Sequence, residues 1–281
     1  MRKPLIAVAL IVALTAASAG QQTASPGKTQ ATTARRPPQA KTQAEFSDYN
    51  TANAVTGGAA AEKAANDFAA KYPDSELRSF LYARAMHEYQ SEDNSSKMLA
   101  MGEKILTIDP DNSVALVLTA TVLSDSLSDA DQDRQQKIAE IRKNANRALQ
   151  TVDTSFTPPA GATPEQIAGY KNTLRSMAYS ALGITDLKLG DHAAAEKELQ
   201  SAADLGKNRP DPYVWYHLAV AQDHQNKYAE ALATVEQAVR LSQPGSELAK
   251  LAAGERERLQ KLTAAAPETQ QPPANKSQPP R

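Results

Sequence analysis

The sequence has 281 residues, of which 41% are hydrophobic and 22% charged, a composition that is ordinary for one or two globular domains. It contains no cysteine, which excludes disulfides, thiolate metal sites and attachment of a lipid to an N-terminal cysteine. The formal net charge of −1 conceals a charge of −8 over residues 45–263, and a folded part this acidic argues against binding to nucleic acid.

The first 19 residues have the three parts of a secretory signal peptide. Arg2 and Lys3 precede an apolar run over residues 5–14, and small residues follow at positions 17–19. We expect cleavage after Ala19 and therefore an exported bacterial protein, either periplasmic or secreted. The alternative is a retained anchor, but the apolar run is shorter than the roughly 20 residues that span a bilayer. No other stretch is apolar enough, so no transmembrane span is expected after cleavage.

Residues 20–44 consist mainly of Gln, Thr, Ala, Ser and Pro, with four basic residues and no acidic one. Such a segment cannot bury enough apolar surface to offset its ordering entropy, which predicts a disordered linker. A basic arm that touches anionic lipid or cell-wall polymer is the alternative. Residues 264–281 contain five prolines and are predicted to be a disordered tail.

The body between these ends, residues 45–263, is predicted to be all-α. Its eight prolines fall between apolar-periodic segments rich in strong helix formers, and no alternating β-branched run is long enough for a strand. Caps and hydrophobic period place about eleven helices. The expected hairpins pair residues 45–55 with 59–71, 76–90 with 95–108, 113–124 with 131–152, 164–189 with 192–205, and 213–225 with 228–241. A loop is expected at 153–162, and helix 247–263 is expected to be a polar-faced cap.

Cap residues mark several of these helix starts. Thr163 and Gln166 can form a capping box around Pro164, which suits the first helical position. Asp191 and Asp211 are placed to cap the two helices that begin after them. We therefore expect helices to begin directly after residues 163 and 191, and at residue 213 after the cap Asp211 and Pro212.

Residues 176–241 contain one helix-turn-helix pattern twice, and the matching Leu182 and Leu218 are 36 residues apart. The first copy comprises Tyr179, Leu182, Gly183, Gly190, Asp191, Ala195, Leu199 and Ala202, and the second comprises Trp215, Leu218, Ala219, Asn226, Lys227, Ala231, Val235 and Ala238. The small residues let two helices approach closely, while the large ones fill the space between them. A fixed period of this kind indicates a solenoid, which binds through an extended surface.

The pattern resembles the tetratricopeptide repeat, in which Trp-x2-Leu-Gly-x2-Tyr is followed by Ala-x3-Phe and then Pro. These two copies match well and residues 80–110 match loosely, whereas Asp186 and Gln222 stand where the family prefers Tyr. The resemblance implies a right-handed superhelical solenoid of about five helical hairpins plus a C-terminal capping helix. It also implies a concave groove, lined by the first helix of each hairpin, that binds a protein or peptide partner.

Position in the repeat implies which side chains face that groove. They are Phe80, His87, Val117, Thr121, Ser180, Ile184, Tyr213, Tyr216, Val220 and His224. Tyr213 and Tyr216 are the strongest contact candidates, because aromatic side chains dominate binding energy. Trp215 occupies a packing position of the pattern and is expected in the core. The Lys and Asn clamp that this family uses for a C-terminal carboxylate has no counterpart at these positions.

No metal site, cofactor or catalytic motif is expected. His217 and His224 are seven residues apart on one helix, about 10 Å along its axis, which is too far for a shared ion. No Gly-rich phosphate loop, Gly-x-Ser-x-Gly elbow or His-Glu-x-x-His is present. The acidic run 124–133 lacks the glycine and terminal glutamate of a calcium loop, so it is predicted to be a solvated turn.

The sequence therefore favours a non-enzymatic adaptor or scaffold of the cell envelope that binds a protein or peptide in its groove. Two alternatives remain open. One is an envelope enzyme or carbohydrate-binding protein with its site near residues 153–162. The other is a self-associating structural scaffold.

Overall fold

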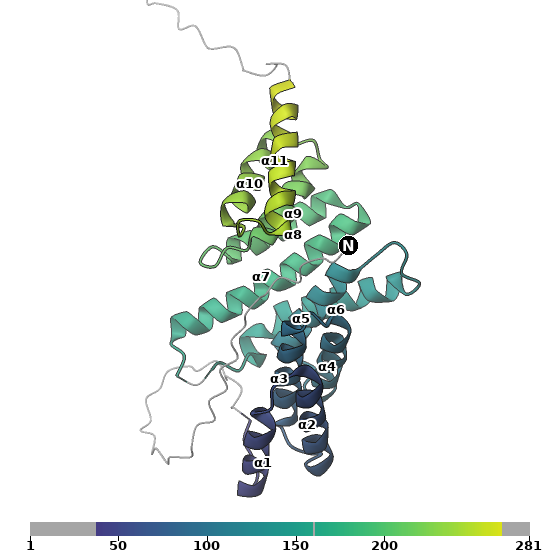
Figure 1. Cartoon of the computed structure of the whole chain (residues 1–281). Helices are drawn as coiled ribbons and strands as arrows, with labels where there is room; N and C mark the ends of the chain where they lie inside the picture. Colours follow the sequence, from purple (N-terminus) through teal and green to yellow (C-terminus); the bar gives the residue numbers. More distant parts are fainter. Residues whose placement is uncertain (1–37, 160, 266–281) are drawn as a thin grey trace, which may run out of the picture.

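The computed structural model describes residues 38–159 and 161–265, and these residues form eleven helices with no strand among them (Figure 1). The hairpins are α1 (Gln43–Asn53) with α2 (Gly58–Lys71), α3 (Arg78–Ser91) with α4 (Ser95–Ile108), α5 (Ser113–Ser126) with α6 (Arg134–Ser155), α7 (Pro164–Leu189) with α8 (His192–Leu205), and α9 (Pro212–Asp223) with α10 (Tyr228–Leu241), followed by α11 (Glu247–Ala265). The predicted signal peptide, the predicted linker up to residue 37 and the predicted tail from residue 266 lie outside the described residues.

The helices form one elongated stack that begins at α1 and ends at α11 (Figure 1). Each helix packs against the next helix along the chain. The first helices of neighbouring hairpins also contact each other, as α5 does with α7 and α7 with α9. The longest helix, α7, crosses the middle of the stack (Figure 1). The predicted all-α solenoid of five hairpins and a last helix is therefore confirmed.

The helix starts follow the predicted caps. The Thr163 hydroxyl accepts a hydrogen bond from the Gln166 N–H, and the Gln166 side chain accepts one from the Thr163 N–H. The carboxylates of Asp191 and Asp211 accept bonds from backbone N–H groups in the first turns of α8 and α9. Helix α7 ends at Gly190, whose φ of 79° is the left-handed conformation that favours glycine. These short-range contacts define where hairpins four and five begin.

Small residues occupy the helix crossings, as the repeat pattern predicted. Ala195, Ala219, Ala231 and Ala238 are fully buried. At Gly183 a Cβ atom would lie 2.6 Å from Leu199 Cγ, which is closer than carbon atoms can approach. Helix α8 therefore packs directly against the backbone of α7. Four buried apolar clusters follow one another along the chain and together form the core of the stack.

Several helix boundaries differ from the predictions by up to three residues, among them boundaries of α6, α3 and α1. Helix α6 continues to Ser155, whose hydroxyl lies 2.6 Å from the Ser113 hydroxyl of α5, and so the predicted loop at 153–162 is shorter. Helix α3 begins at Arg78 rather than at residue 76. Helix α1 begins at Gln43, inside the predicted linker, because the Thr42 hydroxyl accepts a bond from the Glu45 N–H at 3.1 Å. The shifts at α6 and α1 coincide with side-chain contacts that the hydrophobic period does not indicate.

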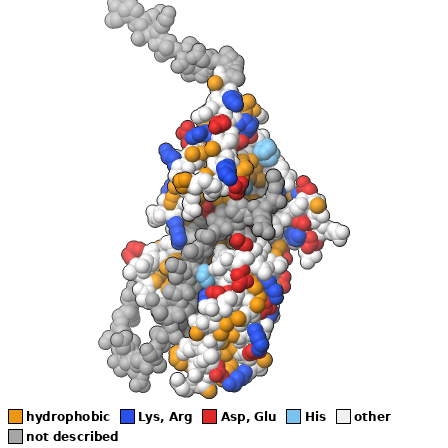
Figure 2. Space-filling model, viewed as in Figure 1, with side chains coloured by type: hydrophobic (Ala, Val, Ile, Leu, Met, Phe, Trp, Pro, Cys, Tyr) orange, Lys and Arg blue, Asp and Glu red, His pale blue; other side chains and the backbone are white. Residues whose placement is uncertain are grey.

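Helix α11 packs against α10 and α9 at the end of the stack. Ala252 and Leu259 are fully buried, whereas Leu251 is 54% exposed. Arg258 forms ion pairs with Asp223 of α9 and with Glu255. Charged side chains of both signs are spread over the visible face of the molecule (Figure 2). None of the helices within the described ranges combines the length and hydropathy needed to cross a bilayer.

Tyr49 on α1 offers a test of this packing. Its ring is buried beside Phe68, and its hydroxyl has no hydrogen-bond partner among the described residues. Burial raises the pKa of Tyr49 to about 12. The folded state thus disfavours the phenolate, so this contribution to stability is complete below the unfolded pKa of about 10 and disappears as pH rises to about 12.

The expected loss from this one group is about 1.4 kcal/mol at pH 11 relative to neutral pH. Urea unfolding followed by circular dichroism at both pH values measures it. Tyr49→Phe keeps the ring, so it should leave neutral stability nearly unchanged and reduce the alkaline loss by that amount. An alkaline loss of the same size in both proteins would contradict the burial of this hydroxyl.

Candidate functional site

A hollow is lined by residues of α3, α4, α5, α7 and α9, and we call the surface formed by α3, α5, α7 and α9, the first helices of their hairpins, the groove. The hollow has a volume of about 50 Å³. This is far below the roughly 300–1,000 Å³ of a small-molecule site, and it matches the end of a single side chain. Apolar lining comes from Met98, Leu118, Val122, Met177, Ile184 and Val214, and polar lining from Gln90, Thr121, Asp125, Ser176, Ser180, Asp211 and Tyr213.

Tyr213 joins two helices that are far apart in the sequence. Its hydroxyl donates a hydrogen bond to the Asp125 carboxylate at 3.1 Å, which connects the start of α9 to the end of α5. The Tyr213 N–H donates to the Asp211 carboxylate at 2.9 Å. The His217 ring packs on the Tyr213 ring with their centroids 4.1 Å apart. Tyr213 is therefore held in one position between two carboxylates.

The electrostatics of the hollow suit a positively charged group. Burial raises the pKa of Tyr213, and the nearby charges of Asp125 and Asp211 act in the same direction, so the phenol stays a neutral donor. Burial raises the pKa of Asp211, while the bond from the Tyr213 N–H lowers it. The Thr121 Oγ1 is buried with no hydrogen-bond partner among the described residues. Carboxylates and a hydroxyl oxygen are the acceptors that an ammonium or guanidinium group requires.

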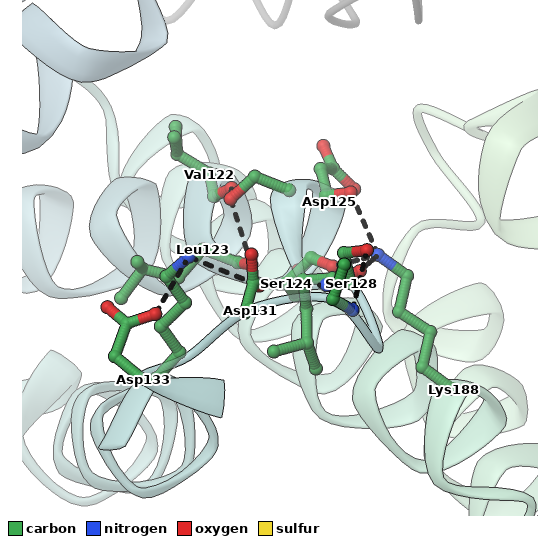
Figure 3. A network of polar contacts seen from close by, with 12 residues as sticks. Val122, Leu123, Ser124, Asp125, Ser128, Asp131, Asp133 and Lys188 are labelled. Carbon is green, nitrogen blue, oxygen red and sulfur yellow. Dashed lines mark hydrogen bonds and ion pairs between the residues drawn. The ribbon is translucent and has the colours of Figure 1, made fainter. Parts of the chain in front are cut away.

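Lys188 fixes the end of α5 beside the hollow. Figure 3 shows it pointing from α7 into the turn that follows α5. Its ammonium donates to the backbone carbonyls of Ser124, Asp125 and Leu127 at 2.5, 2.8 and 2.9 Å. Carbonyls at a helix C-terminus have no partner inside the helix and carry partial negative charge, so a cation stabilises them. The position of Asp125 therefore depends on a lysine from the next hairpin.

The acidic run that follows α5 is exposed at residues 128–130, 132 and 133, as predicted for a solvated turn, and its carboxylates pair with lysine and arginine side chains. Lys137 of α6 lies 3.1 Å from the Asp131 carboxylate and 3.3 Å from that of Asp133. A bond from the Ser128 N–H and the pairing with Lys137 lower the pKa of Asp131. The turn is a structured connection, and its carboxylates neutralise neighbouring cations (Figure 3).

Four of the residues predicted for the groove line the hollow, namely Thr121, Ser180, Ile184 and Tyr213. Val117 is fully buried in the core, where it packs with the second apolar cluster. Phe80 is half-buried against the first cluster, His87 is exposed on α3, and Val220 is half-buried on α9.

Tyr216 and His224 lie outside the hollow. Tyr216 packs against the apolar cluster shared by α9, α10 and α11. The His224 ring stacks on the His192 ring of α8, with centroids 4.3 Å apart and planes within 7°. Trp215 packs against both the third and the fourth cluster, in keeping with its predicted place in the core. Of the two tyrosines favoured for contact, only Tyr213 reaches the hollow.

Asp125, Ser176 and Asp211 also line the hollow, although the sequence did not indicate a functional role for them. Helical spacing could have indicated that two of these residues face the groove. Asp125 lies one turn after Thr121, and Ser176 lies one turn before Ser180, so each shares the face of a predicted groove residue. Asp211 has no such signal, because its part in capping α9 already accounts for it.

The connection near residues 153–162, proposed as an alternative site, is used for packing where the structure describes it. Asp153 belongs to α6, and its carboxylate bonds to Arg175 at 2.7 Å and to Lys171 at 3.4 Å. These two bonds lower the pKa of Asp153. Phe156 is buried, and its ring lies 6.2 Å from that of Tyr170. The segment thus joins the C-terminus of α6 to the first turns of α7.

Within residues 38–159 and 161–265, no group of three or more His, Asp or Glu side chains is placed to hold a metal ion. Comparison with known proteins gives no match to a protein-family model and no match to a curated protein.

Proposed function

We propose that this chain is a non-enzymatic adaptor or scaffold that binds a protein or peptide segment in the groove. The observation that carries the proposal is the hollow between Asp125 and Asp211, which has room for one side chain and acceptors for a positive charge. A partner would lie along α3, α5, α7 and α9 and insert a lysine or arginine there. The repeat pattern supports this proposal, since tetratricopeptide-like solenoids bind extended partners along their first helices.

We further propose that this binding takes place in a bacterial cell envelope. The support is the pattern of Arg2, Lys3, the apolar run and the small residues before position 20, which is typical of a secretory signal peptide. The absence of cysteine means that packing and ion pairs hold the stack together in any redox environment. An envelope adaptor needs such stability outside the cytoplasm.

Site-specific photo-crosslinking in the envelope tests the groove. The photoreactive residue replaces Ser180, which lines the hollow, and a matched control replaces the exposed Ala193 on α8. A partner protein should crosslink at residue 180 and should not at residue 193. Crosslinking of the same proteins with equal yield at both positions would contradict the groove as the binding surface.

The carboxylates provide a quantitative test with the captured partner. Asp125→Asn with Asp211→Asn keeps the shapes and the capping oxygens but removes the charge, and we expect about a tenfold loss of affinity, or about 1.4 kcal/mol. Glu236→Gln on the exposed face of α10 is the matched control and should bind normally. Isothermal titration calorimetry measures the affinity. Equal affinities for the three proteins would exclude a role of these charges.

A further inference from the structure

The segment that precedes the described residues has the opposite charge to the hollow. Residues 20–37 contain Lys28, Arg35 and Arg36 and no acidic residue. The hollow contributes the carboxylates of Asp125 and Asp211. Because both belong to one chain, the basic segment and the carboxylates of the hollow attract each other at any protein concentration.

The described chain begins at the end of α3 that lies farthest from the hollow. Ala40 packs against the first apolar cluster, and the Lys41 ammonium donates to the Asp74 carbonyl at 3.1 Å, in the connection that leads into α3. Gln90, near the other end of α3, lines the hollow. The distance from one end of this 14-residue helix to the other is about 20 Å at 1.5 Å per residue.

The reach of the segment selects one of its basic residues. Lys28 precedes Pro38 by ten residues, and an extended chain of that length spans up to about 35 Å. It can therefore follow α3 and place its side chain at the hollow. Arg35 and Arg36 have at most about 10 Å of chain before Pro38, so their backbone cannot extend along the full length of α3.

We propose that residues 20–37 dock in the groove and place the Lys28 ammonium beside the carboxylates of Asp125 and Asp211. This inference rests on the proposed function, because it assigns to the groove a competitor from the same chain. A tethered segment of this length has an effective concentration of the order of millimolar. A partner must displace the segment, so the docked segment lowers the affinity for the partner. Added salt screens the charges and so weakens the docking of the segment.

Two introduced cysteines can test the docking in the full chain, because it contains no other cysteine. Spin labels at Thr29→Cys and at His87→Cys, one turn from Gln90, should give a narrow distribution of distances below about 30 Å. Charge reversal by Lys28→Glu, Arg35→Glu and Arg36→Glu should broaden it. Reversal of the exposed Lys143, Lys197 and Lys261 to Glu is the matched control and should leave the distribution narrow. Equal widths in the three proteins would overturn the proposal.

A peptide of residues 20–37 added in trans locates the docking site. It should bind at least tenfold more tightly to the charge-reversed chain than to the unaltered chain. The third protein is the charge-reversed chain with Asp125→Asn and Asp211→Asn, which should not bind the peptide. Equal binding to all three proteins would place the segment elsewhere and overturn the proposal. Neither measurement needs a partner, so a chain that captures a partner at Ser180 without docking its segment would leave the proposed function intact.

Discussion

Replacing Ala195 with glutamate is expected to lower the free energy of unfolding by roughly 3–5 kcal/mol. Ala195 is fully buried in the third apolar cluster, where α8 crosses α7. A Cβ atom at Gly183 would lie 3.2 Å from the Ala195 carbonyl oxygen, so the crossing has no room for a longer side chain. Glutamate would bring both extra volume and a carboxylate into this contact. Urea unfolding followed by circular dichroism measures the loss.

The effects of the added charge and of the added volume on stability can be measured separately. The folded state disfavours the introduced carboxylate, which raises its pKa, so the penalty is complete at neutral pH and decreases as pH falls toward the unfolded value of about 4.3. Ala195→Gln has similar volume and should show a loss that does not depend on pH. Ala193→Glu, on the exposed side of α8, should change stability by less than about 0.5 kcal/mol. An unchanged melt for Ala195→Glu would refute the register of this hairpin.

The features that could be predicted from the sequence depend on residues close together in the chain. The capping box of Thr163 and Gln166 and the cap at Asp191 need only a few neighbouring residues, so the pattern indicates them directly. The crossing positions at Ala195 and Ala231 recur at the repeat spacing, and both are fully buried. Local chemistry and period together therefore determine the hairpins of the C-terminal half.

The groove could be predicted only in part. Thr121 and Ser180 line the hollow as their positions in the repeat implied. The bond from Tyr213 to Asp125 spans 88 residues and depends on how α5, α7 and α9 cross, because small differences in crossing angle accumulate along a stack. The sequence shows the capping residue Asp211 but not its distance to Asp125. The hollow therefore emerges only from the complete fold.

Two polar residues occupy packing positions of the repeat pattern. Asp186 and Gln222 stand where the tetratricopeptide pattern prefers tyrosine. In the structure the Asp186 carboxylate pairs with Arg142 of α6 at 2.9 Å. The Gln222 amide donates to Glu196 of α8 at 3.4 Å. Polar links between neighbouring helices replace the aromatic contacts, and their partners cannot be recognised from the repeat spacing.

The Lys188 ammonium is expected to stabilise the end of α5. Lys188→Met keeps most of the aliphatic stem but removes the ammonium from the carbonyls of Ser124, Asp125 and Leu127. A hydrogen bond from a charged donor contributes about 1.5–3 kcal/mol, and carbonyls that lose such a donor at a half-buried helix end are costly. We expect a loss of roughly 2–3 kcal/mol in the free energy of unfolding. The exposed Lys143 of α6 is the matched control, and Lys143→Met should be nearly neutral.

Hydrogen exchange distinguishes a local effect of Lys188→Met from a general loss of stability. The ammonium holds the end of α5, where Asp125 accepts the bond from Tyr213. Exchange should therefore accelerate first in residues 124–130 and at the start of α9, before it changes in α1 to α4. Equal acceleration along the whole stack, or stability equal to that of Lys143→Met, would contradict this prediction. Selective acceleration at α9 would mean that one lysine couples the turn after α5 to the groove, through the bond between Asp125 and Tyr213.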